Sequence, residues 1–125
     1  MPATGSTGPL SVLIVEDEVM IRMLLAGMLE ELGHSVVGEA GHVDEALALV
    51  NSGLKFDVAI LDLNLDGKTA EPIAKAVEAR GLKFLFATGY GASGLPGPFK
   101  GRTFLQKPFA AATLAQALAA LQDGS

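Results

Sequence analysis

The chain has 125 residues, of which 50% are hydrophobic and 18% are charged, a composition typical of one globular domain rather than a disordered chain. The net charge of −5 argues against non-specific nucleic-acid binding, and the absence of cysteine excludes disulfides, thiol nucleophiles and thiolate metal sites. No apolar run reaches the roughly 18 residues of a membrane span, and the N-terminal residues lack a signal-peptide pattern. We therefore expect a cytoplasmic protein.

Strand and helix patterns alternate along the chain after residues 1–9, which we expect to form a flexible leader. Strands are predicted over residues 10–15, 35–40, 56–61, 82–87 and 103–106, and helices over residues 19–32, 43–51, 69–79 and 110–122. Parallel strands need long crossovers, so this alternation predicts an α/β fold: a five-stranded parallel sheet with helices on both faces. The second strand is the more polar and is expected at an edge. One domain, residues 10–122, and a tail, residues 123–125, account for the chain.

One helix is missing from the alternation. Residues 89–102 (GYGASGLPGPFKGR) contain five glycines and two prolines where a fourth crossover helix is expected. Glycine and proline both oppose helix formation. We predict an irregular segment there with at most one helical turn.

The first predicted helix is apolar over more than one face. Its stripe of apolar positions is 21, 24, 25, 28 and 32, and Val19, Met20 and Met23 add apolar surface outside it. The helix is either set deeply in the fold or carries an exposed docking surface.

Polar side chains stand at the carboxyl ends of four predicted strands. Glu16 and Asp17 follow the first strand, Asp62 follows the third, Thr88 the fourth and Lys107 the fifth. The carboxyl ends of parallel strands share one edge of a sheet, where ligands bind in open α/β folds. Each residue also has an ordinary explanation, such as helix capping by Asp17 or a solvated Lys107. Four such strand ends together favour a site.

Three crowded carboxylates repel one another unless a cation neutralises them. Hard oxygen ligands without histidine or cysteine suit Mg²⁺. Thr88 and Lys107 supply a neutral donor and a positive charge for phosphoryl oxygens, and an aspartate can be the nucleophile. The set therefore indicates Mg²⁺-dependent phosphoryl transfer onto a carboxylate. His34 and His42 are too few and too poorly placed for a metal or catalytic role and are expected at the surface.

Three motifs carry a family resemblance: residues 13–18 (LIVEDE), residues 60–62 (ILD) and residues 105–109 (LQKPF). Together they resemble the acidic pair, the phospho-acceptor strand and the lysine–proline motif of response-regulator receiver domains of two-component signalling. The resemblance covers about residues 10–122 and implies a flavodoxin-like sheet of order 2-1-3-4-5.

By this resemblance, Asp62 accepts a phosphoryl group from a histidine kinase or phosphotransfer protein. Mg²⁺ would be bound by Asp17, Asp62 and the backbone carbonyl of Asn64, with Glu16 acting through water. Thr88 and Lys107 would each contact a phosphoryl oxygen. Asn64 and Tyr90 lie two residues beyond Asp62 and Thr88, where the family tunes dephosphorylation. The resemblance implies a stand-alone regulator that acts on, or drains phosphate from, partner proteins, with no direct contact to nucleic acid or membrane and no enzymatic activity beyond self-dephosphorylation.

The sequence also departs from the usual receiver. Asp66 replaces the usual proline four residues after the acceptor, and residues 86–91 (FATGYG) resemble an atypical subgroup with an FATG-type motif. Phe104 lies at the family's aromatic switch position, but without a fourth helix a core role is at least as well supported. Family members dock kinases or phosphotransfer proteins beside the first helix, which makes Ile21 and Leu24 candidate contacts.

Two rival functions remain open. Residues 89–94 match G-x-G-x-x-G after a strand, the pattern of a dinucleotide-binding domain, but Pro96 and Pro98 oppose the helix that it must open. An aspartyl-nucleophile phosphatase usually has a second aspartate two residues after the nucleophile, where this chain has Asn64.

Overall fold

Five parallel strands form the centre of the computed structural model, which describes residues 8–89 and 94–122. The strands are β1 (Ser11–Val15), β2 (Ser35–Ala40), β3 (Val58–Asp62), β6 (Lys83–Thr88) and β7 (Phe104–Gln106), and their order is β2-β1-β3-β6-β7. Counting these five alone gives the predicted order 2-1-3-4-5, and β2 lies at an edge as expected.

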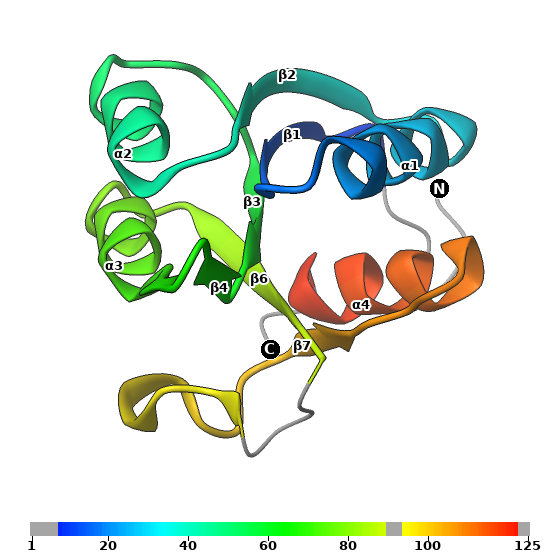
Figure 1. Cartoon of the computed structure of the whole chain (residues 1–125). Helices are drawn as coiled ribbons and strands as arrows, with labels where there is room; N and C mark the ends of the chain where they lie inside the picture. Colours follow the sequence, from blue (N-terminus) through cyan, green and yellow to red (C-terminus); the bar gives the residue numbers. More distant parts are fainter. Residues whose placement is uncertain (1–7, 90–93, 123–125) are drawn as a thin grey trace.

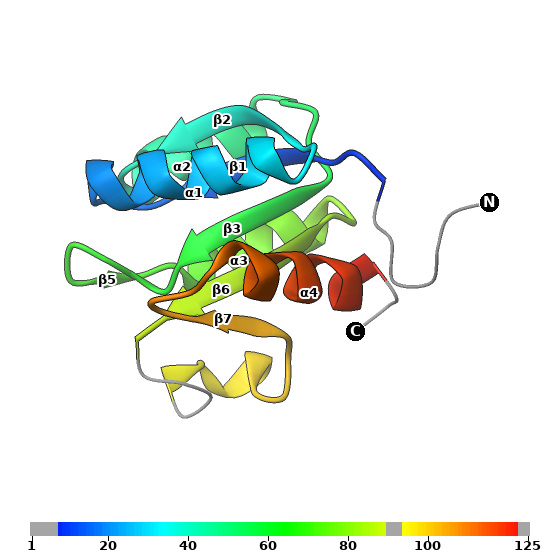
Figure 2. The same cartoon turned by 90° about the vertical axis from the view of Figure 1, so that its right-hand side faces the viewer.

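Helices cover both faces of the sheet (Figure 1). Helices α1 (Val19–Glu31) and α4 (Ala111–Gln122) lie together on one face, while α2 (Val43–Asn51) and α3 (Glu71–Ala79) cover the other. Turned by 90°, the molecule shows α1 and α4 running across the front of the strands (Figure 2). The predicted α/β fold and its doubly wound architecture are confirmed.

The strands divide their side chains between two apolar clusters. In β3, Ala59 and Leu61 pack on the α2–α3 side, and Val58 and Ile60 pack on the α1–α4 side. Side chains alternate across a strand, so a strand covered on both faces is apolar at every position. This explains why β3 is a continuous apolar run up to Asp62.

A small hairpin follows β3 that the sequence patterns do not predict. Strands β4 (Asn64–Leu65) and β5 (Lys68–Thr69) pair antiparallel before α3 begins at Glu71. The predicted start of this helix at Thr69 is therefore wrong, because Thr69 belongs to the hairpin. Strands of two residues are too short to show a periodicity.

Within its described residues 94–103, the crossover between β6 and β7 contains no α-helix; Gly94 and the short helix η2 (Gly97–Phe99) have 3-10 conformation. Leu95 and Phe99 are buried and join the core that α2 and α3 cover. The Phe99 ring meets Phe84 and Phe86 edge-on, at centroid distances of 5.3 and 5.5 Å. The predicted loss of the fourth crossover helix is confirmed for these residues, and two buried side chains fill its place.

Arg102 fixes the far end of this crossover. Its guanidinium lies over the rings of Phe84 and Phe99, 5.2 and 5.7 Å from the ring centroids, and its Nη2 is 2.8 Å from Oε2 of Glu78 on α3. The ion pair thus ties the irregular crossover to α3, and the cation–π contact with Phe84 ties it to β6. No pattern in the sequence indicates this role of Arg102.

Helix α1 leaves one apolar face in solvent. Leu25 and Leu29 are buried, while Val19, Met20, Met23 and Leu24 are 57–76% exposed. Leu24, expected as a candidate docking contact, is among these exposed residues, and Ile21 is partly exposed. Of the two interpretations of this helix, the exposed apolar surface is the one that the structure shows.

His34 is not a surface residue. It is 7% exposed, and its Nδ1 accepts a hydrogen bond of 3.0 Å from the Leu10 backbone N–H. The expectation of a solvated His34 is wrong, because this residue is buried in the connection between α1 and β2. His42 is exposed as expected. Burial lowers the pKa of His34, which keeps the acceptor nitrogen unprotonated.

We predict that His34 makes stability fall below neutral pH. Under about pH 6.5, the unfolded chain binds a proton that folded His34 resists, because its folded pKa is lowered. His34→Leu should cost about 1 kcal/mol of unfolding free energy at pH 7.5, since the Leu10 N–H loses its acceptor. The difference in unfolding free energy between the variant and the wild type should be smaller at pH 5, because only the wild type loses stability as His34 is protonated in the unfolded chain. Urea unfolding at both pH values measures it. A difference that is constant with pH would contradict this role.

Candidate functional site

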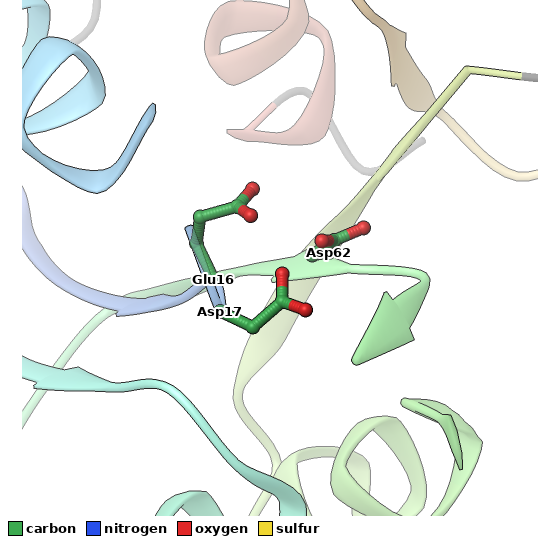
Figure 3. A group of neighbouring side chains, drawn as sticks. All are labelled: Glu16, Asp17 and Asp62. Atoms are coloured by element: carbon green, nitrogen blue, oxygen red, sulfur yellow. The ribbon is translucent and has the colours of Figure 1, made fainter. Parts of the chain in front are cut away.

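Three carboxylates meet at the carboxyl edge of the sheet (Figure 3). Glu16 and Asp17 follow β1, Asp62 ends β3, and carboxylate oxygens of all three lie within 4.8 Å of one another. Glu16 and Asp62 are 3% and 9% exposed, so these charges face little bulk water. Adjacent parallel strands β1 and β3 bring together residues that are more than forty positions apart in the sequence.

Lys107 supplies the positive charge of this cluster. Its Nζ lies 2.8 Å from Oε1 of Glu16 and 3.4 Å from Oδ2 of Asp62. Its backbone N–H donates to the Thr88 carbonyl at 2.8 Å, which continues the pairing of β6 with β7 past the strand end. Thr88 itself is 2% exposed at the end of β6. The strand-end residues singled out in the sequence therefore lie at one edge.

Backbone donors hold the carboxylates in place. The Glu18 N–H donates to Oε2 of Glu16 at 3.1 Å, and the Asp66 N–H donates to Oδ2 of Asp17 at 3.0 Å. The Asn64 N–H donates to Oδ1 of Asp62 at 3.3 Å. Sequence patterns do not identify Asp66 as a neighbour of this cluster, because the contact depends on the hairpin turn.

The electrostatics of Asp62 reflect this crowding. Burial and repulsion by Glu16 raise the pKa of Asp62 to about 7, against the opposing effects of Lys107 and the Asn64 N–H. Burial acts to lower the pKa of Lys107, but its bond to Glu16 and the charge of Asp62 raise it above its ordinary value. Burial would raise the pKa of Asp17, but hydrogen bonds, including that from Asp66, lower it. One carboxylate of the cluster thus holds a proton readily while Lys107 stays charged.

A pocket of about 500 Å³ opens beside Asp62. Asp62, Thr88 and Lys107 line it together with Gly94 and Pro96 of the irregular crossover. Asn64 also lines it, but its side-chain oxygen accepts a hydrogen bond of 3.0 Å from the Gly67 N–H. Tyr90, predicted to tune dephosphorylation, lies outside the described residues.

The donor set fits a hard divalent cation. Asp17, Asp62 and Glu16 offer only oxygen, and their mutual repulsion would be relieved by a positive ion. Mg²⁺ is commonly bound by one or two carboxylates and keeps several waters, which suits a cluster beside an open pocket.

Comparison with known proteins identifies the fold's family. The family model described as "Response regulator receiver domain" matches residues 12–119. The chain belongs to this family. Receiver domains are modules of two-component signalling. Within the described residues, no helix of this receiver is long and apolar enough to cross a membrane.

Several relatives resemble this receiver. The structure of SdrG from Sphingomonas melonis Fr1 is 44% identical with a TM-score of 0.81, covering 93% of this chain and 98% of SdrG. The anti-anti-sigma factor PhyR from Bartonella quintana is 28% identical with a TM-score of 0.77, over 97% of this chain and 52% of PhyR. The transcriptional regulatory protein PdtaR of Mycobacterium tuberculosis is 40% identical over 72 residues, 58% of this chain and 35% of PdtaR. The chain thus spans about a third of PdtaR but nearly all of SdrG.

We predict that Mg²⁺ stabilises the folded chain through this cluster. At about a hundredfold excess over its dissociation constant, Mg²⁺ should add about 2.7 kcal/mol to the unfolding free energy. Asp17→Asn should remove most of this gain, whereas Glu18→Gln, a change at an exposed neighbour, should keep it. Thermal unfolding with EDTA and with Mg²⁺ measures the effect. An equal gain in the Asp17 variant would place the ion elsewhere.

Proposed function

We propose that this receiver accepts a phosphoryl group on Asp62 in a Mg²⁺-dependent reaction, from a histidine kinase or a histidine phosphotransfer protein. The observation that carries the proposal is the position of the Asp62 carboxylate: it ends a buried strand, faces a pocket and lies between Lys107 and the other carboxylates. No other carboxylate in the described part of the chain combines these surroundings.

In the proposed reaction, an Asp62 carboxylate oxygen attacks the phosphorus of a phosphohistidine. The new O–P bond forms as the P–N bond breaks, and the imidazole nitrogen leaves with its electron pair and takes up a proton from solvent. The Lys107 ammonium group moves from Asp62 to pair with one phosphoryl oxygen. The Thr88 hydroxyl donates a hydrogen bond to another phosphoryl oxygen. The carboxylate must be ionised to attack, so the pKa of about 7 is compatible with reaction near neutral pH.

Asp17, Asp62 and the backbone carbonyl of Asn64 are proposed to bind Mg²⁺, with Glu16 acting through water. When bound, Mg²⁺ neutralises the charge that builds up on the transferring phosphoryl oxygens. With a cation held by these carboxylates, Lys107 would no longer be needed to balance the charge of Asp62, and its ammonium group would be available to the phosphoryl group.

We further propose that the chain is a regulator of the FATG-type subgroup that acts on, or drains phosphate from, partner proteins. The support is the 44% identity to SdrG and the irregular crossover where a helix is expected. PhyR from Bartonella quintana, a similar protein, is by its name an anti-anti-sigma factor.

Replacement of the acceptor tests the proposal directly. Asp62→Asn should abolish acid-labile, Mg²⁺-dependent labelling by acetyl phosphate, since the amide oxygen is not an effective nucleophile. Asp44→Asn, an exposed change on α2, is the matched control and should label normally. Intact-mass spectrometry measures both. Labelling that survives in the Asp62 variant would show a different acceptor, and steady turnover of an added phosphate ester would favour the phosphatase alternative.

The donor protein is proposed to dock on α1. An apolar groove of about 320 Å³ lies between α1 and the segment after β7, lined by Ile21, Leu24, Met28, Pro108 and Phe109. Lys107 belongs both to this groove and to the acceptor cluster, so a helix seated in the groove would bring its phosphohistidine beside Asp62. The exposed Met20 and Met23 extend the same apolar helix face.

A variant of Leu24 tests docking of the donor protein without a large effect on folding stability. Its side chain is 63% exposed, so Leu24→Ser should slow phosphotransfer from the donor protein at least about tenfold while barely changing the melting temperature. Labelling by acetyl phosphate should stay normal, because that donor does not dock. The control Leu25→Ala, at a buried neighbour, should instead cost about 3 kcal/mol of stability. A large loss of melting temperature in the Leu24 variant would assign Leu24 to the core.

A further inference from the structure

The turn of the β4–β5 hairpin has a demanding backbone conformation. Asn64 pairs with Thr69 and Leu65 with Lys68, so Asp66 and Gly67 alone form the turn. Their φ angles are 51° and 83°. Two consecutive positive φ values define a type I′ turn, for which an Asp-Gly pair is among the preferred sequences. Asp66 is the one non-glycine residue with positive φ in the described part of the chain.

This turn is anchored at both ends. Leu65 is 1% exposed and packs into the α2–α3 core, while the Ala70 N–H donates to the Leu63 carbonyl at 2.9 Å. The Gly67 N–H donates to the side-chain oxygen of Asn64. The turn therefore has little freedom to move relative to β3.

From this fixed position, the turn contacts the acidic cluster through its backbone. The Asp66 N–H donates to Oδ2 of Asp17 across 49 residues of sequence. A carboxylate offers about four lone-pair positions, so this bond leaves Asp17 with ligand capacity for a metal ion. The Asp66 side chain is not part of the bond and Asp66 is exposed.

We propose that the Asp66–Gly67 turn is a positioning element of the divalent-cation site, in which the Asp66 backbone N–H fixes the Asp17 carboxylate in the orientation that binds Mg²⁺. This inference rests on the proposed function. Hydrogen bonds to a ligand's other atoms orient it, and their loss typically lowers metal affinity 10–100-fold. Asp66 is thus a positioning residue that acts through its φ angle and its N–H, not through its charge.

The test compares Asp66→Pro with Asp66→Asn. Proline has no N–H and a φ near −65°, so it removes the bond and the turn; asparagine keeps the N–H and tolerates positive φ. Both variants lose the same charge. By isothermal titration calorimetry with MgCl₂ on the full chain, Asp66→Pro should weaken Mg²⁺ binding about 10–100-fold and Asp66→Asn no more than about threefold. Equal affinities of the two variants would overturn the proposal.

A reciprocal measurement keeps the test decisive if Asp66→Pro does not fold. Asp17→Ala removes the acceptor, so the Asp66 amide should exchange its hydrogen about tenfold faster, while amides within β3 stay unchanged. Unchanged exchange at Asp66 would overturn the proposal. Failure of the wild-type chain to bind Mg²⁺ would contradict the proposed function itself, which separates the two claims.

Discussion

Burial of negative charge at one edge of a parallel sheet is the constraint on which the site depends. Glu16 and Asp62 are nearly inaccessible to water, and their mutual repulsion is balanced by the ammonium group of Lys107. A buried pair of this kind adds little net stability, because desolvation offsets attraction. Its significance lies in what can replace the ammonium: a divalent cation at the carboxylates would balance the same negative charges and, in the proposed reaction, leave Lys107 available to pair with the phosphoryl oxygens.

The fold brings these groups together by its topology. Strands β1, β3, β6 and β7 are parallel, so their carboxyl ends lie at one edge, and each contributes a residue there. This shared edge can be predicted from the sequence. Alternating strand and helix patterns predict the parallel sheet, and polar residues follow directly where the apolar runs of the strands end. The sequence wrongly predicted His34 at the surface and left open whether α1 exposes an apolar face, because both features depend on how the helices pack rather than on residue type.

The β4–β5 hairpin and the packing of the crossover could not be predicted from the sequence for a different reason. The two-residue strands of the hairpin show no period, and the contact from Asp66 to Asp17 joins positions whose proximity no local pattern encodes. The departure at Asp66 from the usual proline has a physical reason, because φ of 51° is inaccessible to proline. Glycine and proline predicted the loss of the crossover helix, but not that Phe99 and Arg102 would replace its packing.

A crystal structure of the wild-type chain with beryllofluoride and Mg²⁺ tests the central claim most directly. The account predicts a beryllium bonded to a carboxylate oxygen of Asp62, fluorides contacted by Lys107 Nζ and Thr88 Oγ1, and Mg²⁺ bound by Asp17 and Asp62. Beryllofluoride bonded to another carboxylate, or Lys107 still paired with Glu16 and Asp62 in the occupied site, would contradict it.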